Sequence, residues 1–208
     1  MARKIRMLGL ILLAFTIALP AQDRLKTRID ANRRIALKGS RNPRAQAQFD
    51  RGAVDASMKV SYATLHFKPS PSIDLFLSEL QSPGSENFQR WLTPEQFGDR
   101  FGLSKDDVVQ ASAWLKAEGL TVHDVARGRN WITFSGSAQQ VGRAFRTELH
   151  NYQVEGKKHF APVAEPSVPE ALEPLVSGID GLDDFEPESL LRKGPEQPAY
   201  NIGSTHYL

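Results

Sequence analysis

The side chains that could carry out catalysis or hold a metal are spread along this chain without the spacing of a known active site. The sequence contains neither a G-x-S-x-G nucleophile elbow nor the H-E-x-x-H motif of zinc peptidases. Among its five histidines, His150 and His159 come closest to a ligand pair, but they are expected to flank a hairpin. Asp180, Asp183 and Asp184 lack the spacing of a calcium-binding EF-hand loop. We therefore expect no catalytic residue, no metal ligand and no cofactor in this chain.

Composition excludes several further classes of protein. The chain has 208 residues, of which 40% are hydrophobic and 24% charged, as is ordinary for a soluble globular domain. It contains no cysteine, which excludes disulfides and cysteine-ligated metal clusters. The formal net charge is +2, and the basic excess lies between residues 24 and 44. That pattern is typical of a solvated arm rather than of a nucleic-acid-binding patch.

The N-terminus has the three parts of a secretory signal. Basic side chains up to Arg6 are followed by an apolar stretch over residues 7–19 and by a small-residue exit at Pro20 and Ala21. The apolar stretch is shorter than the roughly 20 residues that cross a bilayer. We predict a signal peptide over residues 1–21 and a secreted or periplasmic protein without stable membrane association after cleavage. An uncleaved membrane anchor is the alternative.

Local signals predict a strand and then a series of helices in the first half of the chain. An alternating run over residues 60–67 predicts a half-buried strand, and residues 73–80 have the spacing of an amphipathic helix. Thr93 and Gln96 form a capping box, which predicts a second helix start. Ser104 is expected to cap a third helix, whose apolar residues recur at helical spacing.

The second half is predicted to contain a hairpin, a helix and a final strand. Two β-rich runs surround a glycine-containing turn at residues 127–130, a capping box begins at Ser137, and residues 149–152 alternate. Apolar residues over 169–182 suggest a short helix kinked at Pro174. The resulting order, β-α-α-β-β-α-β, indicates an α+β fold. We expect a ferredoxin-like antiparallel sheet with helices on one face and an extra helix in the first crossover.

Four segments, in order, resemble parts of the activation prodomain of the sedolisin/kumamolisin serine-carboxyl peptidases. They are WLTPEQFGDRFG (residues 91–102), WLKAEGL (114–120), RNWITFSGSAQQVGRAFRTELHNY (129–152) and VPEALEPLVSGIDGL (168–182). The resemblance implies a folding assistant and inhibitor of a serine-type endopeptidase, whose catalytic domain, in cis or in trans, is the expected partner. The family's Ser-Glu-Asp constellation lies in the domain that follows the prodomain. None of those residues is carried over, so we expect this chain by itself to hydrolyse no peptide.

The resemblance suggests a division of the chain into four parts. We expect a signal peptide (1–21), a basic flexible leader (22–55), the activation domain (56–183) and a linker (184–208) toward a catalytic domain that the sequence does not contain. Because a proline-rich linker is an odd place for a protein to end, we expect the reading frame to be a fragment or to be interrupted. The alternative is a free-standing secreted inhibitor, which differs only in whether a peptidase is encoded directly downstream.

An RNA-binding module is a remote alternative, since RNA-recognition domains share the β-α-β-β-α-β order. Residues 127–134, RGRNWITF, lie on the strand that carries the RNP1 motif of those domains. However, Arg129 and Asn130 stand where the motif has an aromatic and a small residue. The predicted signal peptide would also export the chain away from RNA. We therefore expect no nucleic-acid partner.

Strand alternation assigns an aromatic set of side chains to the uncovered face of the sheet. These are Tyr62, His66, His123, Trp131, His150 and Tyr152. Such aromatic area exceeds what a solvated face needs, and we interpret it as the surface that docks on the peptidase. The segment after Leu182 would then pass the active-site cleft like a slow substrate. In the alternative reading, the leader or the last helix covers this face.

Three different triggers could release such an inhibitor in acid. Docking that buries a neutral histidine weakens as the pH falls through the histidine range, near 6.5. In the second hypothesis, carboxylates of the peptidase become protonated in acid and lose their ion pairs with four arginines of this chain, Arg127, Arg129, Arg143 and Arg146. In the third, the histidines are merely exposed and the pH dependence lies wholly in the enzyme.

Overall fold

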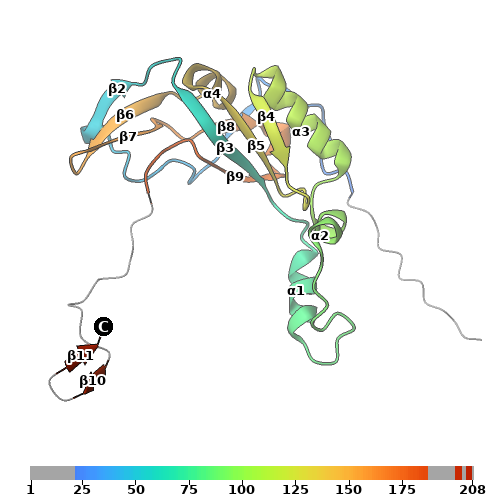
Figure 1. Ribbon diagram of the computed structural model, residues 1–208. Helices are drawn as coiled ribbons and strands as arrows, with labels where there is room; N and C mark the ends of the chain where they lie inside the picture. The colour runs from blue at the N-terminus through green and yellow to red at the C-terminus, as the bar shows by residue number, and fades with distance from the viewer. Residues whose placement is uncertain (1–21, 187–199, 203–204, 208) are drawn as a thin grey trace, which may run out of the picture.

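The main layer of the protein is a four-stranded antiparallel sheet with the spatial order β4-β5-β3-β9 (Figure 1). The computed structural model describes residues 22–186, 200–202 and 205–207, so the predicted signal peptide lies outside the described residues. The four strands are β3 (Lys59–Phe67), β4 (Thr121–Val125), β5 (Trp131–Ser137) and β9 (Val176–Asp180). Strand β3 lies at the centre and pairs with β5 on one side and β9 on the other.

Helices cover one face of this sheet, as predicted for an α+β fold. The connection from β3 to β4 holds α1 (Ile73–Gln81), α2 (Pro94–Phe101) and α3 (Lys105–Ala117), and α4 (Ala138–Phe145) follows β5. Leu115 of α3 and Phe145 of α4 are fully buried in one cluster with Leu65, Ile132 and Phe134 of the sheet. The first crossover of a β-α-β-β-α-β unit has a single helix. Here it has three, which is two extra helices, whereas the predicted fold had one extra helix.

The helix starts are where the capping residues predicted them. Thr93 and Gln96 form a reciprocal capping box before α2, with hydrogen bonds of 3.2 and 2.8 Å. Ser137 and Gln140 do the same before α4, at 3.2 and 2.7 Å. Because each cap satisfies backbone donors that the first helical turn leaves free, the chemistry of four consecutive residues sets the helix start.

The fourth strand of the sheet is not the predicted one. Residues 169–182 form a short 3-10 turn, η2 (Glu170–Leu172), and then strand β9, instead of a kinked helix. Val176 and Ile179 both face the core although they are three residues apart, because the pairing with β3 shifts register around Ser177. This bulge gives a strand the apolar spacing of a helix. Along the chain, the strands of the main sheet and the helices that connect them still follow the order β-α-β-β-α-β, in which β9 is the last strand.

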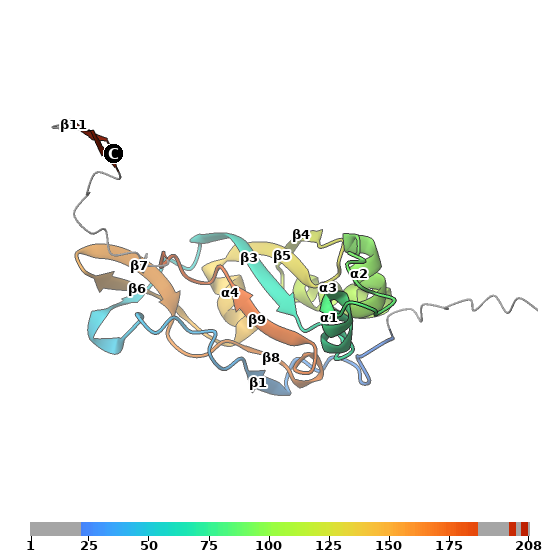
Figure 2. The ribbon, with the colours of Figure 1, turned by 90° about the horizontal axis from the view of Figure 1, so that it is seen from below.

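The predicted final strand belongs to a second sheet at the end of the molecule opposite α1 and α2 (Figures 1 and 2). Its order is β2-β6-β7, and two strand pairs complete the described structure. The strands of the second sheet are β2 (Asp50–Ala53), β6 (Leu149–Val154) and β7 (Lys157–Pro162), and the 3-10 turn η1 (Ala47–Phe49) precedes β2. In the first of the two strand pairs, β1 (Arg34–Ala36) lies antiparallel to β8 (Ser167–Pro169). In the second, β10 (Tyr200–Ile202) lies antiparallel to β11 (Thr205–Tyr207).

The segment predicted as a flexible leader, residues 22–55, is packed against the domain, so that prediction is wrong. Strand β1 pairs with β8, as Figure 2 shows, and Leu25 and Leu37 are buried in the main core. The carboxylate of Asp107 accepts hydrogen bonds from the backbone N–H groups of Arg24 (2.7 Å) and Leu25 (3.0 Å). Single apolar residues within a basic stretch give no periodic signal, although distant parts of the chain bury them.

Candidate docking surface

The face of the main sheet opposite α3 and α4 carries four of the predicted surface residues. We call it the open face and define it by Tyr62 and His66 of β3, His123 of β4, and Trp131 and Ser135 of β5. The side chains next to them in sequence, such as Ala63, Ile132 and Phe134, point the other way and are fully buried. Tyr62 is 63% exposed, while His66 and Trp131 are half-buried. Alternation therefore places these four predicted residues on the side of the sheet away from the core, although Thr133, assigned to the same side, is 3% exposed.

The two histidines of the open face are held in fixed orientations by neighbouring strands. The His123 ring lies parallel to the Tyr62 ring, at 2° with 6.3 Å between ring centroids. Its Nε2 is 2.7 Å from the Ser135 hydroxyl, so β3, β4 and β5 all contribute to this contact. His66 Nε2 lies 2.9 Å from the carboxylate of Asp180 on β9. The open face thus presents an exposed tyrosine on a preorganised polar support.

His150 and Tyr152 do not belong to the open face, which corrects the prediction for these two residues. They lie on β6 in the second sheet, where Tyr152 is 1% exposed and packs in a separate small cluster. Burial raises the pKa of the Tyr152 phenol. His150 Nδ1 lies 2.8 Å from Asp50, and the Gly52 backbone N–H and the His150 ring lower the pKa of the Asp50 carboxyl. Alternation identified two faces correctly but could not show that β6 pairs elsewhere.

The four predicted arginines are dispersed, and three of them bind groups of this chain. Arg127 pairs with Glu95 (3.2 Å), Arg129 pairs with Asp99 (2.9 Å) and donates to the Leu103 carbonyl (2.6 Å), and Arg143 donates to the Glu118 carbonyl (2.7 Å). Arg146 ends α4 with a left-handed backbone, at φ +52°. The side chain of Arg129 is only 15% exposed, so it is part of the support beneath the β4–β5 turn.

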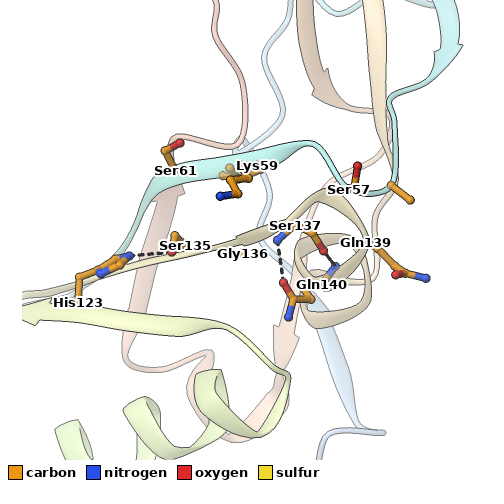
Figure 3. Close-up of a pocket in the computed structure, with 11 residues that line it drawn as sticks. Ser57, Lys59, Ser61, His123, Ser135, Gly136, Ser137, Gln139 and Gln140 are labelled. Carbon is orange, nitrogen blue, oxygen red and sulfur yellow. Dashed lines mark hydrogen bonds between the residues drawn. The ribbon is translucent and has the colours of Figure 1, made fainter.

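A groove of ≈620 Å³ continues the open face toward the start of α4 (Figure 3). His123 and Ser135 line it together with Lys59, Gln139 and the Ser137–Gln140 capping box. Gln140 is fixed in the wall because its Oε1 accepts the Ser137 N–H and its Nε2 donates to the Gly119 carbonyl. Among the described residues that line the groove, none carries a carboxylate, and the ionisable side chains are those of Lys59 and His123. The groove is therefore suited to an acidic or polar group.

The hydrogen bond between His123 and Ser135 was missed by the sequence analysis, since a bulge in the β4–β5 pairing brings the two together. A serine beside a histidine invites comparison with a nucleophile and its base. However, no described carboxylate hydrogen-bonds to His123 and orients it as a catalytic base requires. The nearby N–H groups of Ala138 and Gln139 are also occupied, by the Met58 and Ala56 carbonyls. The arrangement is that of a structural surface contact.

Other kinds of site find no support in the described part of the chain. Within residues 22–186, 200–202 and 205–207, no three His, Cys, Asp or Glu side chains gather where they could hold a metal ion. None of the helices described there has the length and apolar character to cross a bilayer.

Comparison with known proteins decides the family. Residues 47–185 match the family described as "Pro-kumamolisin, activation domain". The chain belongs to this family. The match includes η1 and β2 of the predicted leader and the whole of the main sheet. The resemblance to the sedolisin/kumamolisin prodomain is thus confirmed, and the matched residues form an activation domain of the propeptide type.

Peptidases of the sedolisin family are among the relatives of this activation domain. Xanthomonalisin from Xanthomonas sp. (strain T-22) is 30% identical over 150 residues, which are 67% of this chain and 18% of that protein. Sedolisin from Pseudomonas sp. (strain 101) is 29% identical over 68% of this chain and 24% of its own. Kumamolisin from Bacillus sp. (strain MN-32) is 24% identical over 74% and 28%, respectively. The chain therefore spans less than a third of the length of each of these relatives.

Proposed function

We propose that this chain is the N-terminal activation prodomain of a secreted serine-carboxyl peptidase, which it helps to fold and keeps inactive until the precursor is processed. The observation that carries the proposal is the family match over residues 47–185, on a domain whose sheet leaves one face uncovered by α3 and α4. An antiparallel sheet can leave one face uncovered without loss of its core. A face that exposes a tyrosine on a fixed support has the character of an interface.

In this proposal the open face docks on the catalytic domain. The sequence-based hypothesis sent the chain into the active-site cleft directly after Leu182, but residues 183–186 are held against the second sheet, so we place only the chain beyond Glu186 in that cleft. Tyr62 is the main apolar contact, because 63% of its surface is free to be buried. The groove beside it receives an acidic side chain of the peptidase, since Lys59 and His123 line it and no carboxylate of the described residues does. The prodomain assists folding of the catalytic domain and blocks its active-site cleft, while the hydrolytic chemistry belongs to the catalytic domain.

Mature xanthomonalisin and sedolisin provide a direct test. Preincubation of either enzyme with a molar excess of the purified chain is expected to reduce hydrolysis of a peptide substrate, and the chain is expected to raise the yield of active enzyme after refolding from acid or urea. The chain alone is expected to release no product from casein. A heat-unfolded sample of the chain serves as the control. Full activity of both enzymes and an unchanged refolding yield would contradict the proposal.

The pH dependence of inhibition tests how the prodomain is released. Docking that desolvates a neutral imidazole is strongest above the histidine range and weakens as the pH falls through about 6.5. His123 has Tyr62 and Ser135 as neighbours and Lys59 in the same groove, whereas His66 has the Asp180 carboxylate. We expect the inhibition constant of the wild type to rise on acidification, by up to about tenfold for each histidine that docking buries in its neutral form.

A variant with both His66→Gln and His123→Gln is expected to show a flatter profile between pH 7.5 and 4. His150→Gln is the matched control, because this histidine lies in the second sheet. Superimposable profiles for the wild type and the double variant would show that release depends on other groups, such as carboxylates of the peptidase.

A further inference from the structure

The chain does not leave the domain freely after β9, because residues 183–186 are held against the second sheet. The Asp184 N–H donates to the Phe160 carbonyl (3.3 Å), and the Phe160 N–H donates back to the Asp184 carboxylate (2.8 Å). The Phe185 N–H donates to the Asp183 carboxylate at 3.0 Å, which turns the backbone at this point. These hydrogen bonds fix three consecutive residues of the exit segment.

Side chains from two distant parts of the sequence close around this segment. The Phe185 ring stacks on His159 of β7, at 4.3 Å between centroids and 19° between planes. The guanidinium of Arg44 lies over the same ring at 5.1 Å and also donates to the Glu186 carbonyl (3.3 Å). Asn42 donates to the Asp183 carboxylate at 3.1 Å.

His159 is the centre of the arrangement. Its side chain is 12% exposed, and its Nδ1 lies 3.3 Å from the Asp184 carboxylate. It therefore contacts both residues of the Asp184-Phe185 pair, while Phe185 packs at the edge of the small cluster around Tyr152 and Ala161. Asn42 and Arg44 come from the N-terminal segment that had been predicted to be a flexible leader. The N-terminal segment around residues 42–44 is thus in direct contact with residues 183–186 at the end of the domain.

We propose that Asn42, Arg44, His159 and Phe160 form an exit clamp that keeps residues 183–186 out of reach of a peptidase, so that processing of the precursor does not occur within this segment. A protease cleaves an extended segment that has detached from the fold, so each contact that must open first lowers the rate. The part of this inference that concerns processing of the precursor rests on the proposed prodomain function. The clamp itself is a property of this chain alone.

Chymotrypsin tests the clamp without any partner, because it cleaves after aromatic residues such as Phe185. A synthetic peptide of residues 178–192 gives the rate for the unprotected Phe185–Glu186 bond. We expect this bond to be cut at least tenfold more slowly in the full chain than in the peptide, with products identified by mass spectrometry. Equal rates in chain and peptide would overturn the proposal.

Variants assign the protection to the clamp. His159→Ala and Arg44→Ala are each expected to bring the cleavage rate after Phe185 closer to that of the peptide, and to speed hydrogen exchange at the Asp184 amide. Lys158→Ala, an exposed neighbour on β7, is the matched control. Arg44→Ala keeps the test decisive if His159→Ala disturbs the second sheet. Unchanged protection in both variants would refute the clamp, whereas a chain that keeps the clamp but inhibits no peptidase would refute only the proposed function.

Discussion

A Tyr62→Ala variant is expected to inhibit a mature sedolisin-type peptidase at least tenfold more weakly than the wild type, while unfolding at the same temperature. Tyr62 is 63% exposed and contacts the His123 ring, so its removal takes little from the core of the free domain. Burial of a tyrosine at the centre of an interface commonly contributes about 2 kcal/mol or more, which exceeds a tenfold change in affinity. The Tyr62→Ala variant is therefore expected to keep the unfolding temperature of the wild type and to lose much of its inhibition of the peptidase.

Trp91→Ala is the matched control for this prediction. Trp91 is 79% exposed, also aromatic, and precedes the N-cap residue Thr93 of α2 by two positions, whereas Tyr62 lies on β3. We expect its replacement to change neither the melting temperature nor the inhibition constant. Inhibition constants within twofold of each other for the wild type and Tyr62→Ala would show that the open face is not the docking surface. Trp131→Ala is less decisive, because that side chain is half-buried and lines a pocket together with Pro94 and Phe97.

An Asp107→Ala variant is expected to lose about 3 kcal/mol of stability against unfolding by urea. The Asp107 side chain is fully buried at the start of α3, and its two oxygens accept the backbone N–H groups of Arg24 and Leu25. Removing the carboxylate leaves these two donors without their partner, at a cost of about 1–3 kcal/mol each when they stay buried. It also removes a negative charge from the positive end of the helix dipole.

Asp106→Ala is the control, because Asp106 has the same chemistry in the same helical turn but is exposed. Its replacement is expected to cost less than about 0.5 kcal/mol. Hydrogen exchange at the Arg24 and Leu25 amides is expected to accelerate in Asp107→Ala and to remain slow in Asp106→Ala. A stability loss below about 1 kcal/mol with unchanged exchange would show that this carboxylate does not hold the N-terminal segment to the domain.

The helices and the central strands could be predicted because their determinants are local. Thr93 and Gln96, or Ser137 and Gln140, satisfy each other's backbone within four residues, so no distant contact is needed to start the helix. Alternation in β3 and β5 separates Leu65 and Phe134 from Tyr62 in the same way, because a strand has a period of two. This local information also placed His66, His123 and Trp131 on the open face.

By itself, then, the sequence determined the family, the positions of the helix starts and the alternation of the central strands, since each depends on residues close together in the chain. Only the tertiary structure decided which strand completes the sheet, because the bulge at Ser177 gives β9 the apolar spacing of a helix. It also decided that Tyr152 is buried in a second sheet, and that Asp107 and His159 hold segments more than 20 residues away. Those outcomes depend on pairings between distant parts of the chain, which no pattern within a single segment can specify.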